Sequence, residues 1–533
     1  MFGEFLLVAA VSFLIYAFYK WATINNDFFE RRNIKYMKPK FLVGNVSGTY
    51  INKYTGAEFA NELYQAFPNE SVYGLFDFRT PQYIIRDPEL YKQIAIKDFD
   101  HFEDHYAFLD DTSDKLWGNS LFLMSGEKWR QMRATLSPAF TGSKMRQMFE
   151  LVAECADDVV KHFLEKVEKG EKINIEMKDF FTRYTNDVIA TCAFGLKINS
   201  FFDPKNEFYL NGKILMDFTS TKSMIKLFFI EKIPKIARAL NITFTNPSIA
   251  NAFTSTILNT MSFRQKNKIY RPDMINMLMQ IREGTLKHQI DEMAKEKEGF
   301  ATVEESEIGK LTVKRTWTDD EIVAQCFIFF IAGFETSATI LTFTVYEIAT
   351  NPDIQQKLYE EVVKMSEQLG GKSITYDALQ KMKYLDQVIC EVLRKWPPGF
   401  VVDRLCTKDY NYDDGEKLKL KAEKGDTFIF PVYAIHHDPK YFPNPEKFDP
   451  ERFSDENKNS IISGTYLPFG IGPRNCIGSR FALMEIKAIL YNLLLNFSFE
   501  PNEKTQIPLI LKKSSFSLDS ENGVHLELKP RQK

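Results

Sequence analysis

The sequence predicts a mainly α-helical chain with a minor β region, an α+β architecture that follows one N-terminal membrane helix. Apolar residues recur with helical spacing from about 126 to 281 and again from 318 to 396. Runs typical of short strands occur at 72–76 and 83–86. The stretch Phe5–Tyr19 is apolar and uncharged. Together these patterns indicate a helical body with a small sheet and a membrane anchor.

Length and composition favour one large globular unit. The chain has 533 residues, and no Pro/Gly/Ser-rich linker or internal repeat divides it. Its apolar fraction of 44%, with 47 phenylalanines, is ample for one large core. The net charge of −3 gives no reason to expect nucleic-acid binding.

The histidine and cysteine patterns argue against a zinc enzyme and against a CxxC site. Seven histidines without an HExxH pattern argue against a zinc enzyme. The six cysteines lack CxxC spacing and are expected to be reduced thiols in a cytosol-facing protein. They are Cys155, Cys192, Cys326, Cys390, Cys406 and Cys476.

The N-terminus has the composition of a membrane anchor at 1–22, with Glu4 and Lys20 near the two interfaces. A cleaved signal peptide is the alternative, but Glu4 replaces the basic start of such a peptide. Bulky side chains also occupy the place of its small-residue cleavage site: Phe18, Tyr19 and Trp21.

A basic linker at 23–45 follows the anchor. By the positive-inside rule, its charges keep the remaining chain, 46–533, on the cytosolic side. We expect that remainder to be a single domain. The basic residues are Arg31, Arg32, Lys35, Lys38 and Lys40.

The remaining elements follow in order. Residues 282–316 are charge-rich and predict a solvated connection. Thr318, with acidic residues in the next turn, predicts the start of a long helix that reaches about Thr350. Further helix is expected up to Pro397, then sheet and loop up to Cys476, one more helix and a β-like tail.

The segment from Phe469 to Gly478 is the most informative stretch. Its sequence, FGIGPRNCIG, surrounds Cys476 with glycines that let the backbone approach a flat ligand closely. Because a helix is expected after Gly478, its N-terminus favours a thiolate at Cys476. Such a thiolate is a suitable axial ligand for haem iron, and Arg474 could pair with a haem propionate. A Gly-rich turn around a buried cysteine is the structural alternative.

This motif resembles the cysteine-ligand loop of the cytochrome P-450 haem-thiolate monooxygenases and matches every fixed position of their pattern Phe-x-x-Gly-x-Arg-x-Cys-x-Gly. The resemblance covers nearly the whole chain after residue 45, and the stretches at 121–149 and 185–189 are most similar to insect microsomal members. It implies the cytochrome P-450 fold, with residues 46–533 as the haem-binding catalytic domain.

A glycine, an acid and a hydroxyl interrupt the long apolar helix at Ala332-Gly333-Phe334-Glu335-Thr336. Thr336 could bond the carbonyl of Ala332 or Gly333 and open the helix locally. Packing around a Gly-Thr kink is the alternative. The family pattern Ala-Gly-x-Glu-Thr matches in full, and the resemblance implies that Thr336, assisted by Glu335, supports O–O bond cleavage.

Further charged residues gain meaning from the resemblance. Glu391 and Arg394 share a helix face, which alone indicates only a weak surface pair. The family joins the matching residues to a second arginine, here Arg452, in a buried triad that assembles the haem site. It also implies a set of haem-binding residues: Trp129, Arg133, Arg404, Phe469 and Arg474.

Two aromatic-rich segments, 101–122 and 224–242, indicate ordinary core or amphipathic surface on their own. By resemblance they line the substrate chamber, and the second contacts the membrane. Ile328, Ala332 and Thr336 recur every fourth residue, so one stripe of the long helix is expected to face the substrate. The predicted substrate contacts are Phe108, Phe122, Phe228, Ile328, Ala332 and Val401.

The resemblance implies a membrane-bound monooxygenase that contains haem b and inserts one oxygen atom of O2 into a lipophilic xenobiotic or endogenous substrate. Because no dinucleotide or flavin fingerprint occurs here, electrons are expected from NADPH through a separate flavoprotein reductase, with cytochrome b5 as a second donor. The implied location is the endoplasmic reticulum membrane. A haem-thiolate isomerase or dehydratase and a non-catalytic haem carrier or sensor are the alternatives, and the substrate itself stays open.

Overall fold

The computed structural model describes residues 2–215, 220–283, 299–303, 305–311, 313, 315–415, 418–514 and 517–531. Met1 of the predicted anchor and most of the predicted connection at 282–316 lie outside the described residues. The part of the connection that is described includes one short 3₁₀ turn, η5 (Glu307–Lys310).

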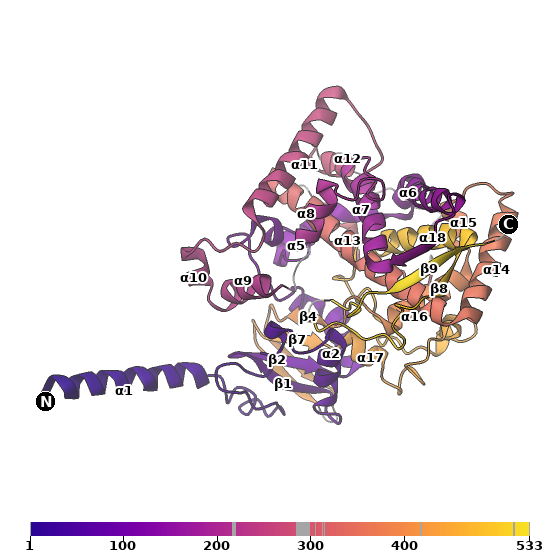
Figure 1. Cartoon of the computed structure of the whole chain (residues 1–533). Coiled ribbons are helices and arrows are strands. Elements are labelled where there is room, and N and C mark those ends of the chain that lie inside the picture. Colours follow the sequence, from indigo (N-terminus) through magenta and orange to yellow (C-terminus); the bar gives the residue numbers. More distant parts are fainter. Residues whose placement is uncertain are drawn as a thin grey trace.

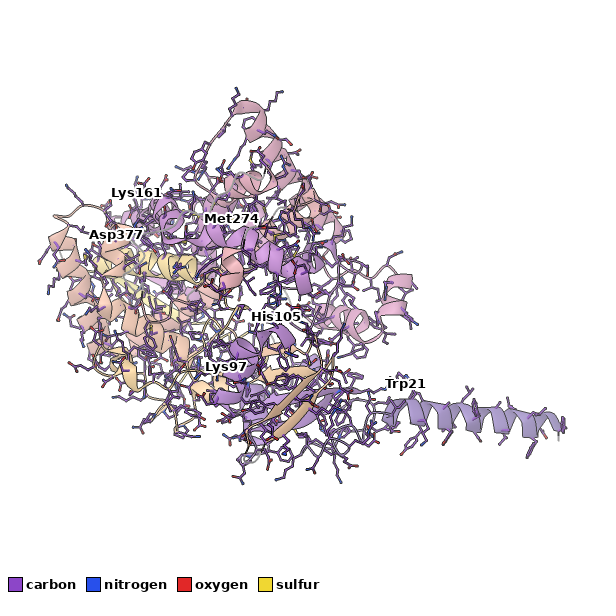
Figure 2. All side chains as sticks on the ribbon, turned by 180° about the vertical axis from the view of Figure 1, so that it is seen from behind. Trp21, Lys97, His105, Lys161, Met274 and Asp377 are labelled. Carbon is purple, nitrogen blue, oxygen red and sulfur yellow. The ribbon has the colours of Figure 1, made fainter. Side chains whose placement is uncertain are left out.

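The N-terminal helix α1 (Phe2–Thr23) projects away from the body (Figure 1). It is apolar and long enough to cross a membrane, and none of its most apolar window is buried by the rest of the chain. Its end is attached to the body, since the Arg79 guanidinium lies 3.9 Å from the centre of the Trp21 ring and the Asn25 amide donates to the Arg79 carbonyl at 2.8 Å. Figure 2 marks Trp21 at this junction. The N-terminal apolar helix predicted from the sequence is therefore confirmed as an anchor candidate.

The body is mostly helical, as predicted. Local signals decide several boundaries: Gly195 adopts φ +65° where α7 ends, and Pro234 begins α10. The helices are α2 (Gly56–Gln65), α3 (Pro88–Lys92), α4 (Lys115–Gly118), α5 (Gly126–Leu136), α6 (Gly142–Glu168), α7 (Met177–Phe194), α8 (Glu207–Leu215), α9 (Thr221–Lys232), α10 (Pro234–Ala239), α11 (Pro247–Asn267), α12 (Met274–Arg282), α13 (Asp319–Thr350), α14 (Pro352–Gln368), α15 (Tyr376–Gln380), α16 (Lys383–Lys395), α17 (Val432–His436) and α18 (Ser479–Asn496).

The minor β region forms small sheets. The largest has the order β1-β2-β7-β4, in which only the β2–β7 pair is parallel. The predicted strands at 72–76 and 83–86 are its first two, and Figure 1 shows this sheet beside the anchor. The others have the orders β3-β9-β8 and β5-β6. The strands are β1 (Val72–Asp77), β2 (Thr80–Ile85), β3 (Ile173–Glu176), β4 (Val402–Leu405), β5 (Tyr410–Asp413), β6 (Lys419–Ala422), β7 (Thr427–Phe430), β8 (Phe497–Pro501) and β9 (His525–Pro530).

Helix α13 is the central helix of the core. Thr318 caps it, and its side chain and that of Glu321 form a reciprocal capping box, so the predicted start is correct. Although α13 is apolar enough to span a membrane, 67% of its most apolar window is buried, as in a core helix. Gly333 allows α7 to pack closely, because a Cβ there would lie 2.4 Å from Ile189 Cδ1. The helix continues through Thr336, so the predicted local opening is absent from this structure.

Candidate active site

A tight loop holds Cys476 immediately before α18. The Cys476 N–H donates to the Phe469 carbonyl at 2.9 Å and closes the loop. Gly472, at φ +75°, lies against the backbone of Ala95, and a Cβ on Gly472 would lie only 1.9 Å from the Ala95 carbonyl oxygen. Arg474 is buried, whereas Cys476 is exposed. The loop therefore leaves the Cys476 thiol accessible to solvent while it buries Arg474.

The environment of the thiol differs from the sequence-based expectation. Although Cys476 is accessible to solvent, the protein packed around the thiol desolvates it and raises the pKa of Cys476, while the Gly478 N–H and the Arg133 charge lower the pKa by less. The helix N-terminus therefore does not outweigh this desolvation. A metal ion that binds the sulfur would supply the missing stabilisation, because a coordinated thiol is deprotonated.

Arg474 binds the loop to the segment before α5. Its guanidinium lies 3.9 Å from the centre of the buried Trp129 ring. It donates to the carbonyls of Glu103, at 2.7 Å, and Met124, at 2.7 Å, and pairs with Asp104 at 3.1 Å. Burial lowers the pKa of Arg474 to about 9, although Asp104 opposes this.

Arg133 lies one helical turn from Trp129 on α5 and contacts the loop from the other side. It donates to the Asn475 carbonyl at 2.7 Å and pairs with Glu305 at 2.9 Å. Glu305 was missed by sequence reasoning because it lies in a charge-rich stretch without a motif. In this structure Arg133 and Arg474 have protein partners, and their role toward haem carboxylates stays a prediction.

Arg404 on β4 provides a test of whether haem fits the site. One of its terminal nitrogens donates to the Ile471 carbonyl of the cysteine loop at 3.3 Å. Its Nε is buried and has no hydrogen-bond partner among the described residues. A buried guanidinium N–H without an acceptor favours an anionic group at this position. The exposed Cys476 thiol and the buried Arg404 N–H without an acceptor are each chemically suited to a haem with carboxylate side chains.

A buried glutamine links the central helix to the same network. Gln325 Oε1 on α13 accepts the Leu121 N–H at 2.8 Å, and its Nε2 donates to the Asn119 carbonyl at 2.7 Å. The Leu121 carbonyl in turn accepts from Arg474 at 3.3 Å. Sequence reasoning missed Gln325, although a lone amide in an apolar helix was an available signal.

The acid and hydroxyl of α13 have different partners. The Thr336 hydroxyl donates to the Ala332 carbonyl at 2.6 Å and is exposed. Glu335 forms a 2.6 Å ion pair with Lys178 of α7, which also contacts Asp519 at 3.1 Å. Burial alone would lower the pKa of Lys178, but the two carboxylates outweigh it and raise the pKa, so the lysine stays charged.

The predicted substrate contacts on α13 form the exposed stripe of a mainly buried helix. Ala332 and Thr336 are exposed and Ile328 is half-buried, four residues apart. Phe122 is 45% exposed, and its ring lies 5.3 Å from His105.

The other predicted contacts occupy several places. Phe108 lies 6.3 Å from the Trp117 ring, and Val401 is half-buried directly before β4. Phe228 of α9 is half-buried, and its ring lies 6.0 Å from the Tyr50 ring. His105 lies near the middle of the molecule in Figure 2 and pairs with Asp403 at 3.0 Å.

Glu391, Arg394 and Arg452 come together as one cluster. Glu391 and Arg394 are fully buried and joined at 2.7 Å, and Arg452 contacts Glu391 at 3.4 Å. Arg394 also donates to the His436 carbonyl at 2.9 Å, and His436 Nε2 accepts the Leu467 N–H at 2.9 Å. The cluster is thereby connected to the start of the cysteine loop.

Comparisons with known proteins agree with this geometry. The family model described as "Cytochrome P450" matches residues 36–526. The chain is 46% identical to "Probable cytochrome P450 9f2" of Drosophila melanogaster over 100% of both chains. It is 42% identical to "Cytochrome P450 9e2" of Blattella germanica, over 98% of this chain and 97% of that protein.

This chain belongs to the cytochrome P-450 family. It is accordingly a monooxygenase of the oxidoreductase class, and family membership implies a haem iron and the use of O2. The family identified from the sequence is confirmed, as is its similarity to insect members.

Proposed function

We propose that this protein is a membrane-bound haem-thiolate monooxygenase for lipophilic xenobiotic or endogenous substrates, with electrons from NADPH through a separate flavoprotein reductase. The observation that carries the proposal is the exposed Cys476 thiol in a glycine-walled loop that buried arginines hold in place. The proposed domains are the anchor at 1–22, the basic linker at 23–45 and the catalytic domain at 46–533.

The residues of the loop and its neighbours bind and orient the cofactor. Cys476 would bind the haem iron through its sulfur, Phe469 and Trp129 would line the site, and the unpaired Arg404 N–H would receive a haem carboxylate, with Arg133 and Arg474 as further partners. When bound, haem supplies the dioxygen and one-electron chemistry. The Glu391 cluster keeps the loop assembled.

Thr336 and Glu335 hold and transfer protons. The exposed Thr336 hydroxyl holds a proton beside the substrate, while Glu335 lies against an open cleft of about 290 Å³ that Lys178, Asp179 and Tyr209 also line. Water in this cleft can exchange protons with Glu335, which sits next to Thr336 in the chain.

The membrane and the electron donors meet different parts of the surface. Helices α9 and α10 lie on the side of the body from which α1 projects (Figure 1), so both can face the endoplasmic reticulum membrane while the catalytic domain stays in the cytosol. Several basic residues are candidates for reductase or cytochrome b5 docking. They are Lys128, Arg130, Lys144 and Arg146. Lys128 is paired with Glu321, Arg130 with Asp100 and Glu103, and Arg146 with Asp377, so Lys144 keeps the most available charge of the four.

The test is spectroscopic and catalytic. The reduced, haem-loaded protein under carbon monoxide should show the absorption band of a thiolate-bound iron, and Cys476→Ala should lose it. NADPH and a purified reductase should then convert a lipophilic probe into a hydroxylated product.

The two alternatives predict other outcomes. Rearrangement of an organic peroxide without reductase would favour the isomerase or dehydratase. Haem binding without any oxidation product would favour the carrier or sensor.

A further inference from the structure

A buried histidine joins α16 to the chain that leads into the cysteine loop. His436, the last residue of α17, is completely buried, and both of its ring nitrogens have partners. Its Nδ1 lies 3.0 Å from the Arg394 carbonyl oxygen of α16, and its Nε2 lies 2.9 Å from the Leu467 nitrogen. One imidazole therefore bridges two segments that are far apart in sequence.

These two contacts fix the tautomer of the ring. The Arg394 carbonyl can only accept a hydrogen bond, so the Nδ1 atom of His436 carries the hydrogen and donates it. The Nε2 atom then has no hydrogen and accepts the Leu467 N–H. Burial, together with the neighbouring His437 and Arg394, lowers the pKa of His436 to about 3, so the ring is neutral, as this arrangement requires.

The Leu467 N–H begins a series of backbone hydrogen bonds that reaches Cys476. The Leu467 carbonyl accepts the Gly470 N–H at 3.1 Å, where the chain turns at φ +73°. The Phe469 carbonyl, inside that turn, accepts the Cys476 N–H at 2.9 Å. A displacement of Leu467 would therefore move the carbonyl that orients Cys476.

The surroundings make the acceptor at His436 important. Tyr466, directly before Leu467, stacks on the His436 ring with the ring centres 5.6 Å apart, and its hydroxyl donates to the Cys390 carbonyl of α16 at 3.0 Å. Leu467 itself is only 3% exposed, so water cannot easily replace the histidine as acceptor. A buried N–H that loses its acceptor costs free energy and favours a shift of the backbone towards another acceptor.

We propose that His436 is a positioning residue for the bond between Cys476 and haem iron: by accepting the Leu467 N–H, it holds the start of the cysteine loop where the sulfur can bind the metal. The inference rests on the proposed function, since it takes Cys476 as the iron ligand. His436 acts through the backbone of the loop, from a buried position on α17.

Two substitutions separate the bond to the loop from the bond to α16. In His436→Asn the amide nitrogen replaces Nδ1 as donor to the Arg394 carbonyl, but the side chain is too short to reach Leu467. In His436→Gln the longer side chain brings an amide oxygen to the position of Nε2, where it accepts the Leu467 N–H. His437→Asn is the matched control, because His437 Nδ1 bonds to the Tyr433 carbonyl of α17 at 2.9 Å.

The measurement is the absorption band of thiolate-bound iron in each reduced, haem-loaded, full-length variant under carbon monoxide, relative to total haem. His436→Asn should lower the ratio of thiolate-bound haem to other haem by about tenfold or more, because a buried amide loses its acceptor. His436→Gln should keep this ratio within about threefold of the wild-type value, and His437→Asn should leave it unchanged.

Amide hydrogen exchange of the same full-length variants without haem gives a second readout. Exchange at residues 467–478 should rise in His436→Asn and stay near the wild-type level in His436→Gln and His437→Asn. If His436→Asn does not fold, the folded His436→Gln variant decides, since its thiolate band then depends on the bond to the loop.

The inference is refuted if His436→Asn keeps the wild-type ratio. It is also refuted if a folded His436→Gln variant loses the thiolate band as His436→Asn does, because the histidine is then only a link between α16 and α17. A wild-type protein that binds haem but never shows the thiolate band would instead overturn the proposed function, and this inference with it.

Discussion

Loss of charge at Glu391 should disconnect the cysteine loop from the helical core. Glu391 accepts two hydrogen bonds from Arg394, at 2.7 and 2.9 Å, one from the Asp449 N–H at 2.9 Å and a longer one from Arg452 at 3.4 Å. Both Glu391 and Arg394 are completely buried. Glu391→Gln keeps the shape of the side chain but leaves the buried guanidinium without a counter-charge.

The magnitude follows from that burial. Breaking one partner of a buried ion pair costs about 3–5 kcal/mol. Asp413→Asn, which breaks an exposed pair with Lys419, should hardly change the stability, because solvent screens such a pair. Arg452→Gln should fall between the two, since Arg452 is partly exposed and its contact is long.

The assay measures haem retention and thermal unfolding of the three variants side by side. Glu391→Gln should lose haem on dilution and unfold first, since Arg394 and His436 connect the cluster to Leu467 beside the cysteine loop. The reasoning is refuted if Glu391→Gln retains haem and unfolds at the temperature of Asp413→Asn.

Three other changes give separate tests. Thr336→Ala should lower product formation by about 10²-fold with a normal carbon monoxide spectrum, because an exposed hydroxyl contributes to proton transfer and little to stability; an unchanged rate would exclude this role. Gln325→Leu should cost about 2–4 kcal/mol in chemical denaturation, because the Leu121 N–H and the Asn119 carbonyl lose their partner; a neutral result would mean that the two groups find other partners. Burial raises the pKa of Glu485 on α18 from 4.5 to about 8, although the Ser337 hydroxyl opposes this slightly. The folded protein therefore keeps a proton that the unfolded chain releases above pH 4.5, so its stability should fall as pH rises from 4.5 to 8, by up to about 5 kcal/mol. Glu485→Gln should flatten this pH dependence of the unfolding temperature, and an identical slope in both proteins would contradict the assignment.

The features that could be predicted from the sequence depend on residues that lie close together in the chain. The cap at Thr318 needs only an acid three positions later, and α13 begins where that pattern requires. The loop around Cys476 is similarly local, since its glycines and its position before α18 are visible in ten consecutive residues. The apolar helix at Phe2–Thr23, the anchor candidate, follows from composition alone.

The partners of these residues depend on packing between distant segments. Lys178 meets Glu335 only because Gly333 lets α7 approach α13. Arg133 meets Glu305, and Lys232 meets Asp77, across gaps of more than a hundred residues in sequence.

Desolvation by the surrounding protein also opposes one local expectation, since it raises the pKa of Cys476 where the helix terminus alone would lower it. The linear pattern thus determined the family and the main helices, because each arises from short-range geometry, and Cys476 as the metal-binding residue stays a prediction. The direction of the pKa shift of the thiol and the counter-ions of the arginines were decided by tertiary structure, because solvent exclusion and charge pairing depend on which surfaces meet.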